Sequence, residues 1–376
     1  MDVLHITEAC GAGVRRHLQL IVPALVERGI SCGVFAYGSR FEPGFAEEME
    51  RLASAGCQVK LQRTDGDRLL NLPSAVNCIE GLYRSWAPGI AHLHAYAAGI
   101  AGRLASMRPM IVYSPHAFGI HSPVSCLKRG IVRTTEVFLA RRTNAFSFVG
   151  SAELEDAFKL GLPREKCFLL QNGLPASFRT RLKSRSEALA ALGICPKGLA
   201  AVAPCRLEPQ KGLHILLDAL ALLGDAAPNV FIFGEGSQKT SLAKQAAKLG
   251  IERVVSFMQP RPDLVACLKA FDIGIIPSFY EGLSYSLLEL LCAGVPLVAS
   301  DTGANAPLPW MGRCVNYFSN GSKASLAGAL RNIAANLTSA RERAVEAQTH
   351  ACADFSLQKQ VEALAALYRS LRRSKE

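Results

Sequence analysis

The segment from Pro277 to Glu289 combines residue types that bind anions and hydroxyl groups. An apolar strand ends at Pro277, a turn follows that contains Glu281 and Gly282, and a helix then starts at Ser284. The first amide groups of that helix and its dipole favour an anion such as a diphosphate, and the glycine lets a ligand approach the backbone. The carboxylates of Glu281 and Glu289 can accept strong hydrogen bonds from hydroxyl groups.

A simpler explanation of the two glutamates is that they are exposed acids near a helix start, where the dipole stabilises them. Glu289, however, lies within an apolar run, between Leu287, Leu288, Leu290 and Leu291. A charge in such a run requires a partner. This neighbourhood favours the functional interpretation of Glu289.

A second charged group follows the first strand expected in the second half of the chain. Arg206 lies at the end of this strand, and Lys211 precedes Gly212, where a helix starts. Two cations so placed could clamp a diphosphate and stabilise it as a leaving group. Surface salt bridges with Glu208 are the alternative.

Parallel β-sheets covered by helices are expected to position these segments, because short apolar runs alternate with longer amphipathic ones. The expected strands are Val3–Thr7, Ser31–Ala36, Ile90–His94, Met110–Ser114, Ala145–Val149, Leu199–Ala203, Val230–Phe233, Val254–Phe257, Ile273–Ile276 and Pro296–Ser300. The expected helices are Val14–Arg28, Pro43–Ala55, Ser74–Trp86, Ala97–Ser106, Gly212–Leu223, Lys239–Leu249, Leu264–Ala270, Ser284–Ala293 and Leu357–Leu371. In such sheets ligands bind beyond the carboxyl ends of the strands.

The length of 376 residues predicts two domains, because single cores rarely exceed about 250–300 residues. A polar, basic stretch over 177–186 and the segment Pro196-Lys197-Gly198 mark the boundary. We expect an N-terminal domain over residues 1–178, a linker over 179–196 and a C-terminal domain over 197–355. Residues 356–376 form a closing helix with a basic end.

Composition indicates a globular intracellular protein that prefers anionic partners. The chain is 49% hydrophobic, has no run of about 20 apolar residues and carries a net charge of +11, which favours polyanions. Its start lacks the features of a secretory signal. The 12 cysteines are scattered without zinc-ligand spacing, which is typical of buried thiols in a reducing cytosol. We therefore expect a cytoplasmic protein without a bound metal.

The basic residues do not form an aromatic-basic motif of the kind that binds nucleic acid, so no such partner is expected. Their densest cluster lies on an expected helix that also carries Val132, Val137, Phe138 and Leu139. Either an ordinary solvated face or contact with anionic lipid at the inner face of the membrane explains this helix. The cluster consists of Lys128, Arg129, Arg133, Arg141 and Arg142.

A set of motifs, taken in order, resembles the retaining glycosyltransferases of glycosyltransferase family 4, of the polysaccharide-biosynthesis type. The motifs are Arg206, Lys211-Gly212, Phe233-Gly-Glu-Gly236, Glu281-x7-Glu289 with Gly282-Leu283, and Ala293-Gly-Val-Pro296. The resemblance covers nearly the whole chain. It implies the GT-B fold, an α/β architecture in which two Rossmann-like domains face a central cleft, with the closing helix packed back on the N-terminal domain.

The resemblance also implies roles for residues of the donor site. Arg206 and Lys211 would neutralise the donor diphosphate, and Glu281 would hold hydroxyl groups of the donor sugar. The amides of Gly282 and Leu283 would approach sugar or phosphate. The remaining donor contacts would come from Glu289, which would bind the ribose, and from Gly234 and Gly13. No cofactor and no metal ion is implied, because the nucleotide sugar is itself a substrate.

In the N-terminal half, the loop Gly11-Ala-Gly13 is able to approach phosphate. Arg15-Arg16 replaces the acid usual in the family and could suit an anionic acceptor. His116 ends a strand at the position of the family's active-site histidine, where it could donate to the donor sugar or to developing charge. His92 and His94 alternate on a strand and so share a face; a metal pair is conceivable, but core or cleft packing is favoured.

Two departures from the family pattern affect the donor pocket. Cys205 occupies a common glycine position, and residues 303–307 lack the usual glycine pair and acid. Neither departure is expected to disable the site.

The expected activity is hexosyl transfer from a UDP- or GDP-sugar to a saccharide or lipid-linked saccharide, with retention and without a metal ion. The open alternatives are a nucleotide-sugar epimerase of the same architecture and a non-catalytic relative that binds nucleotides or polyanions. A glycosidase that uses the two glutamates is disfavoured, because it needs no diphosphate clamp.

Overall fold

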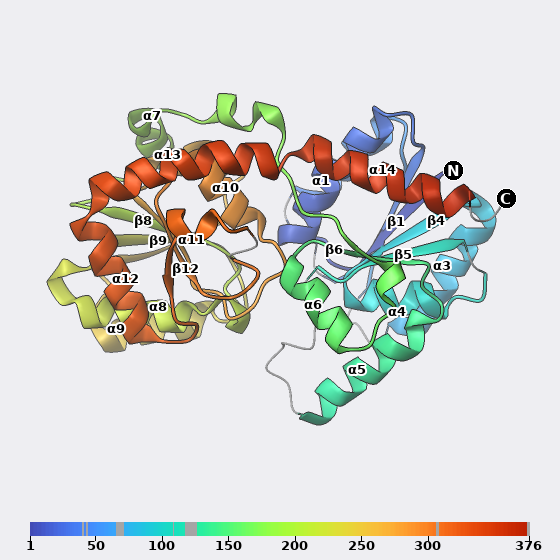
Figure 1. Ribbon diagram of the computed structural model, residues 1–376, viewed down its shortest axis with the longest axis horizontal. Coiled ribbons are helices and arrows are strands. Elements are labelled where there is room, and N and C mark those ends of the chain that lie inside the picture. Colours follow the sequence, from blue (N-terminus) through green and yellow to red (C-terminus); the bar gives the residue numbers. More distant parts are fainter. Residues whose placement is uncertain are drawn as a thin grey trace. The chain divides into compact units, whose positions relative to one another are not determined.

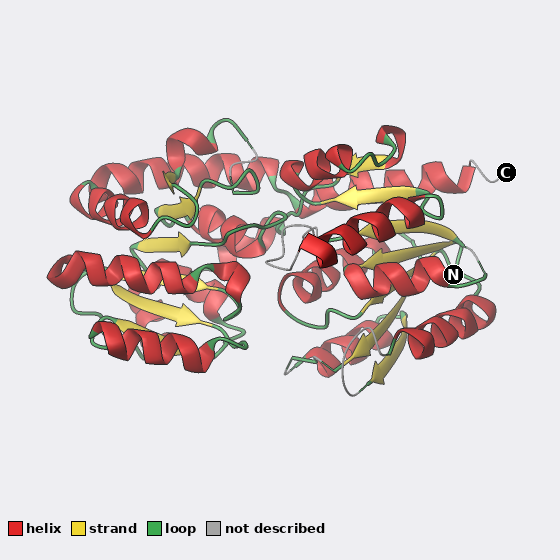
Figure 2. Ribbon diagram, turned by 90° about the horizontal axis from the view of Figure 1, so that it is seen from below, coloured by secondary structure: helices red, strands yellow, loops and turns green. Residues whose placement is uncertain are grey.

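The computed structural model describes residues 1–39, 41, 42, 44–64, 71–107, 109–116, 126–305 and 308–373, without the side chains of 126–129. The chain divides into two compact units. One comprises Met1–Asn172 with Leu357–Glu376, and the other comprises Gly173–Ser356. Each unit is a parallel sheet between helices, as Figure 2 shows. This confirms the expected α/β class with two Rossmann-like domains.

The sheet of the first unit has seven strands in the order β3-β2-β1-β4-β5-β6-β7. Its strands are β1 (Val3–Thr7), β2 (Cys32–Gly38), β3 (Gln58–Arg63), β4 (Ile90–His94), β5 (Met110–Ser114), β6 (Ala145–Phe148) and β7 (Cys167–Leu169). Every residue of β1, β2, β4 and β6 is buried, because helices cover both faces of a parallel sheet. Register pairs Thr7 with His94 and His94 with Ser114, which brings three polar side chains to the carboxyl edge.

Helices cover the two faces of this sheet in separate groups (Figure 1). They are α1 (Ala12–Val26), α2 (Phe45–Ser54), α3 (Leu72–Trp86), α4 (Tyr96–Leu104), α5 (Cys126–Ala140), α6 (Ser151–Lys159), η2 (Arg164–Lys166) and α14 (Leu357–Arg373). One core joins α1, α2 and α14 to the sheet, and another joins α3, α4 and α6 to the opposite face. Pro23 lies inside α1, and the helix continues to Val26.

The last helix of the chain belongs to the first unit. Val361, Leu364 and Tyr368 of α14 share a buried cluster with Leu18 and Ile21 of α1. Figure 1 shows α14, in red, crossing beside α1. The apolar positions of α14 recur at helical spacing, so one face of the helix covers the sheet.

The second unit holds a six-stranded parallel sheet in the order β10-β9-β8-β11-β12-β13. Its strands are β8 (Ala200–Pro204), β9 (Asn229–Phe233), β10 (Val255–Met258), β11 (Ile273–Ile276), β12 (Leu297–Ser300) and β13 (Asn316–Phe318). Its helices are η3 (Ala176–Arg181), α7 (Arg185–Leu192), η4 (Pro209–Lys211), α8 (Leu213–Leu223), η5 (Gly224–Ala226), α9 (Lys239–Leu249), η6 (Leu264–Ala270), α10 (Tyr285–Ala293), α11 (Met311–Cys314), α12 (Lys323–Ala335) and α13 (Leu337–Asp354). A buried aliphatic cluster joins α8 and α12 to the sheet.

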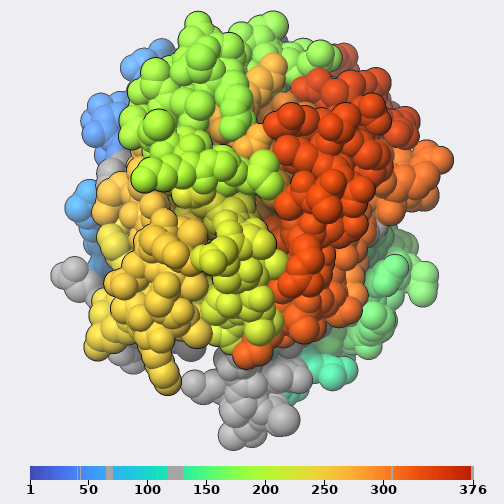
Figure 3. Space-filling view, turned by 90° about the vertical axis from the view of Figure 1, so that its left-hand side faces the viewer, coloured from blue at the N-terminus to red at the C-terminus, as the bar shows by residue number. Residues whose placement is uncertain are grey.

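Residues 179–196, expected to link the domains, instead belong to the second unit. They include α7, which starts at a capping box formed by Ser184 and Glu187 and packs against η6. Asp272, at the start of β11, accepts hydrogen bonds from Arg185 and Arg341 and so joins α7 to α13. Figure 3 shows α12 and α13, in red, and the green segment with α7 on one face of this unit.

Most of the expected strands and helices lie where the sequence predicts them. The strands β3, β7 and β13 and the helices α6, α7, α11, α12 and α13 were not among the expected elements. Four of the six residues of β3 and two of the three of β7 are exposed, so these two strands lack the apolar pattern of a buried strand. Residues Leu264–Ala270 form a 3₁₀-helix, η6, in place of the expected α-helix.

The described cysteines are free thiols. None of the described helices combines the length and apolar character that spanning a bilayer requires. In the basic cluster of α5, the side chains of Lys128 and Arg129 lie outside the described residues, as do the final residues 374–376.

Candidate functional site

The structure brings Lys211 and Glu281 together beyond the carboxyl ends of β8 and β11. The Lys211 Nζ forms a salt bridge with the Glu281 carboxylate, and their side chains are only 13% and 9% exposed. Ser278 Oγ donates to the same carboxylate at 2.7 Å. The sequence placed the two residues at one site but assigned them to different parts of a ligand. The salt bridge shows in addition that the Lys211 and Glu281 side chains hold each other in position.

Glycines allow the loops at this edge to pack backbone against backbone. A Cβ on Gly212 would lie 2.1 Å from the Pro277 carbonyl oxygen, and a Cβ on Gly234 would lie 1.9 Å from that of Cys205. Neither contact leaves room for a side chain. The segment with Lys211 is therefore held against the end of β11, where Phe279 N–H donates to Gln210 O at 2.9 Å.

Arg206 is partly buried at the end of β8, and no salt bridge is recorded for it within the described part of the chain. The carboxylate of Glu208, the alternative partner for Arg206 and Lys211, accepts a hydrogen bond from Ser237 Oγ at 2.7 Å. Arg206 thus presents a positive charge at the strand edge that no carboxylate of the described residues balances in a salt bridge, which suits an anionic ligand.

The helix α10 begins at the turn that holds Glu281. Ser284 is its N-cap, as expected, but makes no side-chain capping bond. Ser286 Oγ donates to Pro204 O at 2.8 Å and joins the first turn to the end of β8. The start of α10 therefore lies near Arg206 and adds its dipole to the same edge.

The remaining residues expected in the donor site occupy different environments. Gly282 and Leu283 form the turn before α10, and the Leu283 side chain is buried at 2% exposure. Glu289 lies more than one turn into α10 and is also buried, at 9% exposure, as its leucine neighbours predict. Burial raises the pKa of the Cys205 thiol to about 12, so this residue stays neutral beside the cations.

The departure at residues 303–307 falls partly outside the described residues, which end at Asn305 and resume at residue 308. Asn305 is fully buried and donates to Ser300 O at 3.1 Å. Its own carbonyl accepts from Tyr317 OH at 2.8 Å. These bonds hold the segment after β12 in place, although it lacks the glycine pair that is usual in the family.

In the first unit, the loop between β1 and α1 is held by acidic residues of the protein. Ala12 has a positive φ of 48° and its N–H donates to Glu42 at 3.1 Å. Arg15 forms salt bridges with Glu42 and Glu48. Two carboxylates of the protein therefore already balance the charge of Arg15, which was expected to suit an anionic acceptor. Gly13 is exposed, and a Cβ added there would have open space around it.

Histidines gather at the carboxyl edge of the first sheet. His92 and His94 share one face of β4, as predicted, with ring centroids 4.1 Å apart. The Nδ1 of His94 lies 2.9 Å from Nε2 of His116, which follows β5 with a positive φ of 56°. His5 from β1 and His17 from α1 complete the cluster.

Sequence reasoning missed His5, His17 and Glu8 at this edge. His5 lies in the middle of an apolar strand, and a polar residue at such a position is a signal that could have been noticed. His17 gives a weaker signal, because it appears only as a polar residue on the buried face of α1. The buried Glu8 carboxylate accepts from the N–H groups of Ala97 and Ala98 at 3.0 and 2.8 Å and so caps α4. The start of α4 is therefore occupied by the protein itself.

Burial keeps the histidine cluster neutral near pH 7. It lowers the pKa of His5 to about 3 and that of His17 to about 4. It also lowers the pKa of His92, His94 and His116 well below the usual range. Within the described residues, two groups of three histidines have nitrogens within 4.8 Å of one another. They are His5, His92 and His94, and His17, His94 and His116.

Both units match glycosyltransferase family models. Residues 12–173 match the glycosyl transferase 4-like domain, and residues 187–350 match glycosyl transferases group 1. Among curated relatives, glycogen synthase of Mycobacterium tuberculosis is 29% identical over 306 residues, which are 78% of this chain and 71% of that protein. A galactosyltransferase of Escherichia coli, UDP-Gal:alpha-D-GlcNAc-diphosphoundecaprenol alpha-1,3-galactosyltransferase, is 25% identical over 57% of this chain and 58% of its own.

Solved structures share the fold over nearly the whole length. HepE of Anabaena, in complex with UDP-glucose, aligns with a TM-score of 0.81 at 20% identity, over 98% of this chain and all of that chain. Sucrose-phosphate synthase of Thermosynechococcus elongatus aligns with a TM-score of 0.82 at 16% identity over the full length of both. The two family matches and this shared architecture identify the chain as a glycosyltransferase of the GT-B fold that belongs with the family 4-like enzymes.

Proposed function

We propose that the protein transfers a hexose from a UDP- or GDP-sugar to a saccharide or a lipid-linked saccharide, with retention of the anomeric configuration. The observation that carries this proposal is the pairing of Lys211 with Glu281 next to Arg206, which forms no salt bridge with a described residue. These groups lie at the carboxyl ends of β8 and β11, in the unit that matches glycosyl transferases group 1. The nucleotide sugars that the relatives' names print, UDP-glucose and UDP-galactose, support the donor class.

Each charged group has a distinct role in the proposed reaction. Arg206 and Lys211 neutralise the diphosphate and stabilise it as the bond to the sugar breaks. The two cations supply the charge that a divalent metal ion would otherwise provide, so a chelator should not reduce transfer. Glu281 keeps Lys211 in place and accepts hydrogen bonds from sugar hydroxyls, and Glu289 accepts from the ribose. Amides of Gly282 and Leu283 at the start of α10 complete the donor site.

Retention follows in this proposal from the donor phosphate, which removes the proton of the acceptor hydroxyl on the face that the phosphate leaves. His116 donates a hydrogen bond to an oxygen of the donor. The proton passes to the departing diphosphate, and the new glycosidic bond forms as the old bond breaks. The anomeric coupling constant of the product, measured by NMR, tests retention directly.

Calorimetry against UDP, GDP and their sugar conjugates tests the proposed donor class. We expect micromolar binding of one nucleotide and a loss of at least about tenfold in Arg206→Ala, because a charged hydrogen bond contributes about 1.5–3 kcal/mol. Arg253→Ala is the matched control, since Arg253 is 68% exposed, precedes β10 at the opposite edge and pairs with Asp225. Equal affinity in all three proteins would contradict the donor site. Conversion of the sugar nucleotide without an acceptor would indicate an epimerase instead.

We further propose that α5 contacts anionic lipid. Its inner side is fixed by Glu136, whose buried carboxylate pairs with Arg103 at 2.9 Å. Its outer side exposes Ile131, Val137 and Phe138, at 56%, 45% and 61%. Arg133 and Arg141 line a shallow pocket together with Val137 and Phe138. Apolar side chains flanked by arginines are the pattern of a helix that lies in a membrane interface.

Sedimentation with vesicles tests this contact. The wild type should sediment with vesicles that contain anionic lipid and remain in the supernatant with neutral vesicles. Phe138→Ser should weaken the binding about tenfold or more, because burial of a phenylalanine contributes about 1.5–3 kcal/mol. Leu222→Ser, at a position 54% exposed on α8, is the matched control. Binding that is equal in both variants, or indifferent to lipid charge, would contradict the proposed contact.

A further inference from the structure

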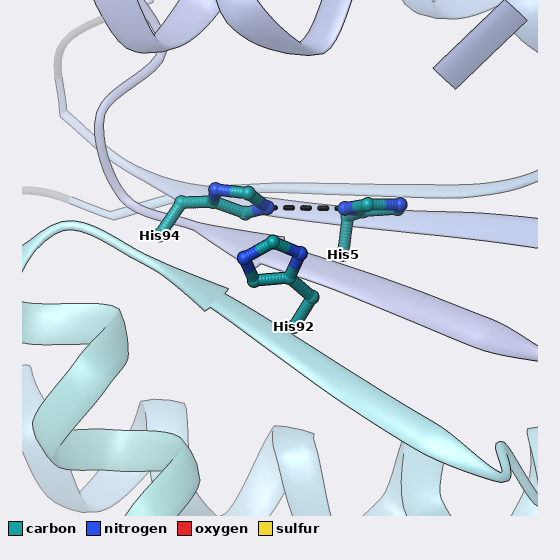
Figure 4. A group of neighbouring side chains, drawn as sticks. All are labelled: His5, His92 and His94. Carbon is teal, nitrogen blue, oxygen red and sulfur yellow. Dashed lines mark hydrogen bonds between the residues drawn. The ribbon is translucent and has the colours of Figure 1, made fainter. Parts of the chain in front are cut away.

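Three of the buried histidines form a chain of hydrogen bonds in the first unit. Nδ1 of His5 lies 3.0 Å from Nε2 of His94, and Figure 4 shows this bond as a dashed line between the two rings. On its other side, Nδ1 of His94 lies 2.9 Å from Nε2 of His116. Both nitrogens of His94 therefore face a nitrogen of another imidazole.

The protons in this chain can follow only two arrangements. A neutral imidazole carries one proton, so one of its nitrogens donates and the other accepts. In the forward arrangement all three protons lie on Nδ1, so that His5 donates to His94 and His94 donates to His116. In the reverse arrangement all three protons lie on Nε2, so that His116 donates to His94 and His94 donates to His5. The state of one ring thus determines the state of all three.

The far nitrogen of His5 distinguishes the two arrangements. Nε2 of His5 is buried and has no hydrogen-bond partner among the described residues. In the reverse arrangement this nitrogen would carry a proton, and a buried N–H group without an acceptor is rare and costly. In the forward arrangement it carries only a lone pair, which is less costly to bury. The forward direction is therefore favoured.

We propose that His5 and His94 are positioning residues that hold His116 in the tautomer with its proton on Nδ1. His116 then serves as a neutral hydrogen-bond donor to an oxygen of the nucleotide sugar, and not as a general base through that nitrogen. This inference rests on the proposed function for the ligand, but the tautomer itself follows from the geometry of the chain.

A metal ion bound by the same histidines is the main alternative. The nitrogens of His5, His92 and His94 lie within 4.8 Å of one another. However, two nitrogens on one tetrahedral zinc ion lie about 3.3 Å apart, given bonds of about 2.0–2.1 Å, whereas the facing pairs here lie 3.0 and 2.9 Å apart.

Both ring nitrogens of His92 already have hydrogen-bond partners outside this group. It makes hydrogen bonds to Tyr368 OH at 2.6 Å and to Ser114 Oγ at 2.8 Å. In Figure 4 it lies beside the His5–His94 bond without joining it. The spacing therefore favours a hydrogen-bonded chain over a metal centre.

Long-range ¹H–¹⁵N NMR of protein labelled with ¹⁵N in its histidine rings tests the proposal, because protonated and unprotonated ring nitrogens have separate shifts. Signals are assigned from single His→Gln variants. At pH 7 we expect His94 and His116 to show the Nδ1–H tautomer in the wild type. The Nε2–H tautomer at His116 would overturn the proposal, whatever the variants do.

Two variants of His5 separate positioning from packing. His5→Asn keeps an N–H donor near the Nδ1 position, whereas His5→Phe keeps an aromatic ring without a donor. We expect His5→Asn to preserve the tautomer of His116, and His5→Phe to mix the two tautomers and lower kcat about three- to tenfold, the effect of one neutral hydrogen bond. An unchanged tautomer in folded His5→Phe would contradict the role of His5.

The outcomes also separate this inference from the proposed function. If the tautomers are as expected but His116→Ala transfers sugar at the wild-type rate, the catalytic role of His116 is wrong. The chain of hydrogen bonds between the three histidines is then still confirmed. Titration with Co²⁺ provides the last check. One equivalent bound with visible absorption bands that His94→Ala abolishes would establish a metal centre and overturn the hydrogen-bonded chain.

Discussion

Lys211→Ala should reduce sugar transfer by at least about a hundredfold, the effect of removing one preorganised group that stabilises developing charge. The amine provides a cation for the diphosphate and holds Glu281, whose side chain is 9% exposed. Without the amine, the Glu281 carboxylate keeps the hydrogen bond from the Ser278 hydroxyl, but its uncompensated charge repels the negative ligand. Both effects weaken binding of the departing diphosphate. Measured kcat/KM for the donor, with calorimetry of the nucleoside diphosphate, checks this expectation.

Two further variants identify the cause of the loss. Lys239→Ala removes a lysine that also pairs with a glutamate, but this pair is 44% and 43% exposed, and we expect activity within about twofold of wild type. Lys211→Arg keeps the charge in a different shape and should recover part of the activity. Transfer by Lys211→Ala at more than half the wild-type rate would remove Lys211 from the site.

Gly212→Ala should destabilise the second unit by several kcal/mol and abolish measurable donor binding. Gly212 has a φ of +63°, where a Cβ costs about 1–2 kcal/mol. The added Cβ would also lie 2.1 Å from the carbonyl oxygen of Pro277. A backbone atom cannot rotate away as a side chain can, so η4 must move off β11, at a further cost of about 1–3 kcal/mol. That movement displaces Lys211.

Gly250→Ala provides the matched control. Gly250 has a φ of +66°, but an added Cβ there would meet no atom within 4 Å. It should show the conformational cost alone, without loss of donor affinity. Urea unfolding of both variants and calorimetry with the nucleotide measure the two effects separately. Equal destabilisation and equal affinity would show that the contact between η4 and β11 does not position the site.

The sequence predicts the sheets well where strands are buried on both faces. β1, β4, β5 and β11 have the predicted bounds, because continuous apolar runs between turn signals are typical of central parallel strands. β3, β7 and β13 escaped prediction. Exposed residues interrupt the first two, and pairing with a neighbouring strand defines such edge elements more than their own composition does.

The interpretation of charged residues was less complete. The motifs located Arg206, Lys211, Glu281 and Glu289 in the second unit, but charge partners come from distant segments. Lys211 and Glu281 are 70 residues apart, and Glu208 bonds Ser237, which is 29 residues away. Arg15 illustrates the same point in the first unit. The sequence suggested a free cation, whereas Glu42 and Glu48 balance it.

By itself, the sequence determined the α/β class, the two-unit organisation, the glycosyltransferase motifs and the turn glycines, because these depend on local patterns and on residue types that a site requires. Only the tertiary structure decided which charges pair, which glycines admit no side chain, and how His5, His94 and His116 join across β1, β4 and β5. Those features depend on distances between segments far apart in the chain. The order and pairing of the strands in the folded sheet set these distances.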